Sequence, residues 1–203
     1  MKFKSIILLF ASFISLTACR GVSGESFDFD KYQDYRDKVG SSYGTAKGLL
    51  PPVDELGECN DVQFSYKKVD SFIFVSEGIA LFLDYNEENY TLAKSYVEGK
   101  YTFIDQPCTT YSDSKHFDFP VASFTYKDYS FRIAPTLQTK ESTGETYYMC
   151  KSFVMIGYNE SISSVAYLYY HDFDIDYLYS TDSIDDINQV MPKLIEDSFF
   201  WRK

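Results

Sequence analysis

Hydrophobic and polar side chains alternate over much of the chain between residues 61 and 173, and a period of two is typical of β-strands. Val62, Phe64 and Tyr66, for example, alternate with polar neighbours. Short clusters of turn-forming residues separate the apolar runs. The pattern predicts three hairpins, with strands Phe72–Val75 and Ile79–Tyr85 around Ser76–Gly78, Val121–Tyr126 and Tyr129–Ala134 around Lys127-Asp128, and Tyr147–Tyr158 and Ser164–Phe173 around Asn159–Ser161.

Three segments show the apolar spacing of helices instead. The clearest begins after Asn86, a good N-cap residue, carries two glutamates in its first turn, and is expected to end near residue 98. A second is expected near residues 183–200, where Pro192 predicts a kink or the start of a separate short helix. A third, shorter helix is indicated within residues 27–39.

Strands outnumber helices, and short turns connect most of them. Such connections favour antiparallel pairing. The sequence therefore predicts an α+β fold, a mostly antiparallel β-sheet with two or three covering helices. Residues 27–203 are enough for a single domain with a substantial core.

The first residues have the pattern of an export signal. Lys2 and Lys4 give a basic start, and an uncharged stretch of fourteen residues then runs from Ser5 to Ala18. This stretch is shorter than the ~20 apolar residues that a membrane-spanning helix needs. It ends in the residues Leu16-Thr17-Ala18-Cys19, an aliphatic and two small residues before a cysteine.

This ending resembles the lipobox of bacterial lipoproteins. The resemblance implies cleavage between Ala18 and Cys19 and a diacylglyceryl group on the Cys19 sulfur, and two acyl chains give stable anchoring. The expected organisation is a signal peptide (1–18), a short membrane tether (19–26) and an extracytoplasmic domain (27–203). An ordinary secretory signal or a buried first helix is the alternative, but the segment lacks the polar face of a buried amphipathic helix.

Charge narrows the range of partners. The net charge is −11, and removing residues 1–18 with their two lysines takes it to −13. Such a balance argues against binding to nucleic acid and against electrostatic binding to anionic lipid headgroups. It suits either simple solubility or a cationic partner.

Three cysteines besides Cys19 remain, and an exported location permits disulfides. Cys59 and Cys108 both lie beside turn-forming residues, whereas Cys150 lies in a predicted strand. We therefore favour a Cys59–Cys108 disulfide among the three possible pairings. The alternative is three reduced thiols.

Catalytic motifs are missing from the sequence: it has no Gly-rich nucleotide loop, no HExxH, no CxxC and no GxSxG. A free Cys150 beside His171 on the partner strand would be the only thiol–histidine candidate. Asp172, Asp174 and Asp176 share one face of a strand and imitate the start of a calcium loop, but Tyr177 stands where an EF-hand needs glycine. A solvated acidic face is the preferred interpretation, and no cofactor is expected.

These observations lead to one hypothesis with two alternatives. The leading one is a membrane-anchored extracytoplasmic lipoprotein that acts as a non-enzymatic binding module for an unknown protein or small molecule. The first alternative is a cell-surface hydrolase or thiol enzyme without a recognisable motif. The second is an acidic inhibitor or immunity protein that neutralises a cationic partner.

Overall fold

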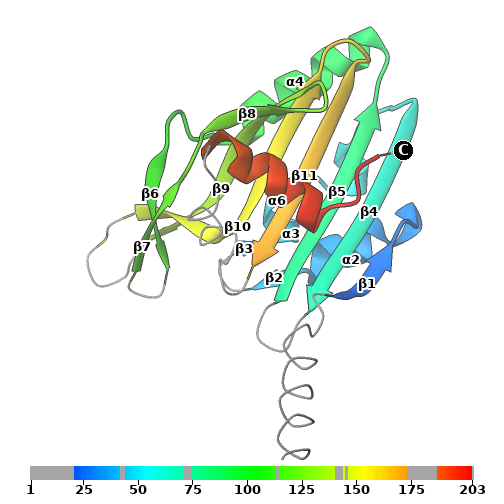
Figure 1. The fold of residues 1–203 in the computed structure, drawn as a ribbon. Helices are drawn as coiled ribbons and strands as arrows, with labels where there is room; N and C mark the ends of the chain where they lie inside the picture. The colour runs from blue at the N-terminus through cyan, green and yellow to red at the C-terminus, as the bar shows by residue number, and fades with distance from the viewer. Residues whose placement is uncertain are drawn as a thin grey trace, which may run out of the picture.

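One antiparallel sheet organises the molecule. The computed structural model describes residues 21–41, 44–70, 75–112, 115–139, 144, 146–172 and 187–202. Its seven-stranded sheet has the order β1-β4-β5-β11-β10-β9-β8, and all neighbouring strands are antiparallel (Figure 1). The strands are β1 (Gly21–Ser26), β4 (Asp61–Asp70), β5 (Val75–Asp84), β8 (Ser123–Tyr126), β9 (Tyr129–Thr139), β10 (Thr146–Asn159) and β11 (Ser164–Asp172).

Short elements and helices complete this α+β fold, which confirms the predicted class. Two small two-stranded ladders lie outside the main sheet, β2 (Gly40–Ser41) with β3 (Gly44–Thr45) and β6 (Cys108–Ser112) with β7 (Lys115–Phe119). The helical elements are η2 (Phe29–Lys31), α2 (Tyr32–Lys38), α3 (Ala46–Leu49), η3 (Val53–Glu55), α4 (Glu87–Lys100), η5 (Ile187–Gln189) and α6 (Val190–Ser198). Within the described ranges no helix is both long enough and apolar enough to cross a bilayer.

Two of the predicted hairpins are confirmed. β10 and β11 pair from Ser152–His171 to Asn159–Ser164, as the alternating pattern indicates. β8 and β9 meet across Lys127 and Asp128, whose φ angles are 45° and 66°. Positive φ at both central residues belongs to the tight hairpin turn whose twist matches that of the flanking strands.

The third predicted hairpin is wrong. Residues 76–78 do not form a turn but lie inside β5, which pairs with β4 on one side and with β11 on the other. Gly78 is needed for a different reason: a Cβ at this position would lie 2.4 Å from the carbonyl oxygen of Ser198. This glycine lets the end of α6 approach the sheet closely.

Helix boundaries follow the capping residues. The Asn86 side chain accepts a hydrogen bond from the N–H of Asn89 at 2.8 Å, so α4 begins where the sequence predicts. Pro192 is the third residue of α6, in the first turn, where backbone N–H groups have no intrahelical acceptor. Pro192 therefore lies in the first turn of a short helix that begins at Val190, and it does not kink a long one.

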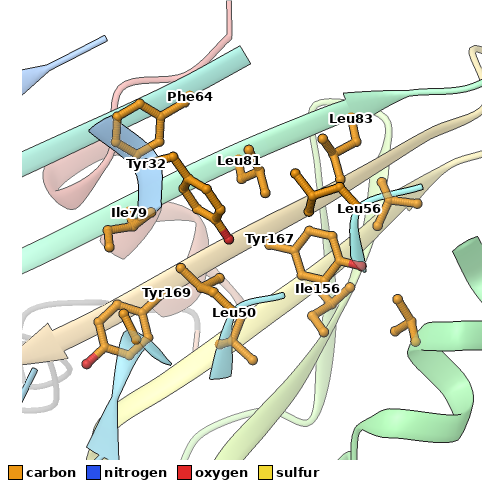
Figure 2. Packing of buried hydrophobic residues seen from close by; sticks show 14 of the residues in the cluster. Tyr32, Leu50, Leu56, Phe64, Ile79, Leu81, Leu83, Ile156, Tyr167 and Tyr169 are labelled. Atoms are coloured by element: carbon orange, nitrogen blue, oxygen red, sulfur yellow. The ribbon is translucent and has the colours of Figure 1, made fainter. Parts of the chain in front are cut away.

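Helices and loops cover both faces of the sheet. Figure 1 shows α6 lying across one face, with α2, α3 and α4 behind the other. Along β11, Ala166, Leu168 and Tyr170 pack under α6, while Val165, Tyr167 and Tyr169 pack against the opposite cluster. Figure 2 shows part of that second cluster, in which tyrosine rings from the sheet and from α2 pack among leucines and isoleucines.

The predicted tether is wrong in extent. Gly21–Ser26 forms β1 and pairs with the second half of β4, from Gly21–Asp70 to Ser26–Tyr66. Glycines and serines suggested a flexible linker, but the ladder is made by backbone groups, and Glu25 lies opposite Lys67. The folded domain therefore begins by residue 21 and not at residue 27.

Candidate functional site

The structure describes only some of the cysteines for which the sequence predicts a role. Ala18 and Cys19 lie outside the described residues, so the lipobox stays a prediction. Cys59 is a half-buried free thiol, and burial raises the pKa of that thiol. The structure thus gives no support to a Cys59–Cys108 disulfide, and the side chains of Cys108 and Cys150 lie outside its described part.

Asp172, the first of the three aspartates predicted to form a solvated acidic face, is buried. Asp172 is 1% exposed at the end of β11, and the Tyr170 hydroxyl donates a hydrogen bond to its Oδ2 at 3.0 Å. Clusters of buried residues cover β11 on both faces of the sheet, which is why the alternation exposes neither face. Asp174 and Asp176 lie outside the described residues, and the described part of the chain holds no group of three metal-ligating side chains.

His171 is engaged inside the protein. Its Nδ1 lies 2.7 Å from Oγ of Ser152 across the β10–β11 ladder and 3.1 Å from the Lys151 carbonyl oxygen. Burial lowers the pKa of His171, which favours the neutral ring. Ser152 is 0% exposed, so this serine–histidine contact is closed to a substrate and acts as a structural contact.

The outer edge of β4 is half open. β1 covers only Tyr66–Asp70, and Asp61–Ser65 has no strand partner on that side among the described residues. An uncovered strand edge presents unpaired N–H and C=O groups to its surroundings. The first half of β4 is therefore a ready template for another strand.

Hydrogen bonding identifies which groups point outward. Tyr85 donates its N–H to Ser163 on the β11 side at 3.0 Å, so its neighbour Asp84 faces β4. Backbone polar groups of successive residues point to opposite sides of an antiparallel strand. Through the β4–β5 register, Val62 and Phe64 direct their N–H and C=O groups toward the open edge.

Aromatic side chains form walls along this edge. A cavity of about 260 Å³ lies here, with Phe27 and Phe29 on the N-terminal side and Phe200 and Trp201 on the C-terminal side. Phe27, which is 55% exposed, contacts Phe200 with ring centroids 5.0 Å apart. We call this feature the β4 groove: the open edge Val62–Ser65 with its walls, the four aromatic residues named above together with Phe82 and Arg202.

The C-terminal wall is held rigidly. Arg202 donates two hydrogen bonds to the Asp84 carboxylate, each 2.7 Å long, and one to the Tyr129 hydroxyl at 2.9 Å. The Arg202 guanidinium holds the pKa of Asp84 below its usual range. The Trp201 ring lies edge-on to Phe82, with centroids 5.0 Å apart. The wall is thus pre-formed, which lowers the entropic cost of binding.

Charge around the β4 groove is mainly negative. Asp28, Asp30 and Asp61 are exposed and are adjacent in sequence to residues that line the groove. Asp28 forms an ion pair with Lys31 at 3.7 Å, whereas Asp30 and Asp61 form none with a described residue. The nearby Lys67 is engaged, because its Nζ donates to the Asp197 carbonyl oxygen at 2.6 Å and lies over the Phe200 ring. A ligand that carries positive charge is therefore favoured.

Sequence patterns gave no direct signal for this groove. Its lining comes from four segments far apart in the chain, around residues 27, 62, 82 and 200, and the alternation at Val62 predicted only a strand. Comparison with known proteins adds no functional assignment to the geometry. No protein-family model matches the chain, and no curated protein or solved structure is significantly similar to it.

Proposed function

We propose that the protein is a lipid-anchored extracytoplasmic binding module that takes up an extended segment of a partner protein in the β4 groove. The observation that carries this proposal is the unpaired half of β4 between aromatic walls. An added strand gains affinity from main-chain hydrogen bonds, and pockets for its alternate side chains provide specificity. The lipobox residues Leu16–Cys19 support the anchor.

The chemistry of the groove defines the partner segment. Alternate residues of a bound strand point to opposite sides, so apolar side chains would contact the aromatic walls. The intervening side chains would lie outside the walls, where the exposed carboxylates of Asp30 and Asp61 are adjacent in sequence to the groove. An extended peptide in which apolar and basic residues alternate satisfies both conditions.

Replacement of Cys19 by serine is expected to release the protein from membranes. Serine cannot form the thioether, so the acyl chains that hold the chain at the bilayer are lost. The measurement is the distribution between membrane and soluble fractions, together with the mass of the N-terminal peptide. Cys59→Ser is the matched control and should leave both unchanged; an unacylated N-terminus in the unaltered protein would refute the anchor.

Replacement of Val62 by proline is expected to weaken peptide binding by about tenfold, the effect of one lost hydrogen bond of ~1.4 kcal/mol. Proline removes an outward N–H that has no strand partner among the described residues, and edge strands tolerate proline at such positions. The measurement is fluorescence anisotropy with a short labelled peptide of alternating valine and lysine.

Val62→Ile keeps the N–H and is the matched control, which should bind as the unaltered protein does. A peptide of alternating valine and glutamate should bind poorly to all three proteins. Equal binding of the lysine peptide to the proline and isoleucine variants would show that the contact is only electrostatic, and strand addition would then be rejected.

A further inference from the structure

A second cavity, separate from the β4 groove, lies between η3 and α4. Its volume is about 270 Å³, just below the range of roughly 300–1,000 Å³ for small-molecule sites. The residues that define its chemistry are Leu56, Glu58, Tyr85, Leu92, Tyr96 and Tyr167. It shares no lining residue with the β4 groove.

Tyr167 forms the floor of this cavity. The residue is 2% exposed, and its hydroxyl has no hydrogen-bond partner among the described residues. Figure 2 shows its ring beside Leu56, with the hydroxyl oxygen directed toward the segment that carries Leu56. Among the described residues the fully enclosed hydroxyls without a partner are those of Tyr90 and Tyr101. The Tyr167 hydroxyl instead reaches the cavity, where water or a polar group of a ligand can bond to it.

The other tyrosines of the cavity have partners within the protein. The Tyr85 hydroxyl donates to the Leu56 carbonyl oxygen at 2.8 Å, and the Tyr96 hydroxyl donates to the Glu55 carboxylate. Burial raises the pKa of Tyr167 well above its usual value, so the phenol remains a neutral donor and acceptor. A ligand that fills the cavity therefore needs a hydrogen-bonding group opposite the Tyr167 hydroxyl.

The free charge at the mouth of this cavity is negative. Glu58 is exposed and forms no ion pair with a described residue, although its carbonyl oxygen accepts a hydrogen bond from Asn89 at 2.9 Å. Glu55 is already neutralised, because Lys100 donates to it at 2.7 Å. Aromatic faces next to an unpaired carboxylate favour an organic cation.

We propose that this cavity binds a small organic amine, with its ammonium group at Glu58 and a hydroxyl or carbonyl group at its other end bonded to Tyr167. The apolar middle of such a molecule packs between Leu56, Leu92 and Tyr96. The cavity thus recognises a ligand with a polar group at each end. An amine without the second polar group would displace water from the Tyr167 hydroxyl and leave its hydrogen bond unreplaced.

Titration calorimetry with tyramine, on full-length protein in mild detergent, tests the proposal. Phenethylamine lacks only the hydroxyl and is expected to bind about threefold to tenfold more weakly. Tyr167→Phe removes only the matching hydroxyl and should abolish this preference. 3-(4-Hydroxyphenyl)propionate, in which a carboxylate replaces the ammonium, should not bind.

Further variants separate this site from the proposed peptide groove. Glu58→Gln should weaken both amines by the same factor, whereas Glu88→Gln, on the first turn of α4 and outside the cavity, should change neither. Val62→Pro should leave tyramine binding intact even if it abolishes peptide binding. Absence of saturable tyramine binding, or a hydroxyl preference that survives in Tyr167→Phe, would overturn the proposal and indicate that the cavity holds water only.

Discussion

Replacement of Gly78 by alanine is expected to destabilise the protein by about 3 kcal/mol, the upper end of the usual range for overpacking. The added Cβ would lie 2.4 Å from the Ser198 carbonyl oxygen and 3.1 Å from two ring carbons of Phe199. A backbone oxygen at the end of α6 cannot rotate away as a side chain can. Either the C-terminal segment detaches from β5, or the strand shifts against both of its neighbours.

Urea unfolding followed by two probes measures this effect. Trp201 is the only tryptophan and reports on the C-terminal segment, while circular dichroism reports on the whole sheet. Gly99→Ala is the matched control, because its Cβ meets nothing within 4 Å and lies in α4, where alanine should stabilise by about 0.5–1 kcal/mol. A Gly78→Ala variant as stable as the unaltered protein would show that the close approach of α6 is not required.

Replacement of Arg202 by methionine is expected to cost about 2–3 kcal/mol at neutral pH. Breaking a fully buried ion pair costs about 3–5 kcal/mol, and we reduce this range because the Arg202 and Asp84 side chains are 17% and 23% exposed. Methionine keeps much of the apolar stem but removes the donors to Asp84 and to Tyr129. The double variant Asp84→Asn/Arg202→Met should recover part of the loss, since no unpaired carboxylate remains.

The pH dependence of this effect has a defined sign. The pKa of Asp84 is lowered in the folded state by the Arg202 guanidinium. Its contribution is therefore complete above the unfolded-state pKa of about 3.9 and is lost as pH falls through the lower folded-state value. Denaturant unfolding at pH 7 and pH 3 should show a smaller difference between unaltered and Arg202→Met protein at pH 3. A difference that is equal at both values would exclude the charged pair as its source.

The sequence predicted elements whose geometry is set locally. Asn86 identifies the start of α4 because an N-cap bond involves residues only three positions apart. Lys127 and Asp128 identify a hairpin because two residues suffice to reverse the chain. In both cases the determining contact lies within the segment itself.

Elements that depend on distant contacts were missed. Gly78 was interpreted as a turn residue, since nothing near it in sequence shows that Ser198 packs against it. Residues 21–26 were interpreted as a linker, because only β4, some 45 residues later, reveals that they pair. The same holds for the two candidate sites: the cavity over Tyr167 exists only because η3 and α4 lie over that face of β11.

If the proposed lipid anchor forms on Cys19, the position of β1 determines how close the sheet lies to the membrane. Gly21 pairs with Asp70, so an acyl group on Cys19 would be separated from the sheet by Arg20 alone. A connection of one residue would restrict the rotation of the domain relative to the membrane. It would keep the Asp70 end of β4 close to the lipid surface. Asp61 is at the other end of β4, nine residues from Asp70, which is roughly 30 Å along the strand with a rise of ~3.4 Å per residue. The uncovered edge would then face outward, within reach of molecules approaching from beyond the headgroups.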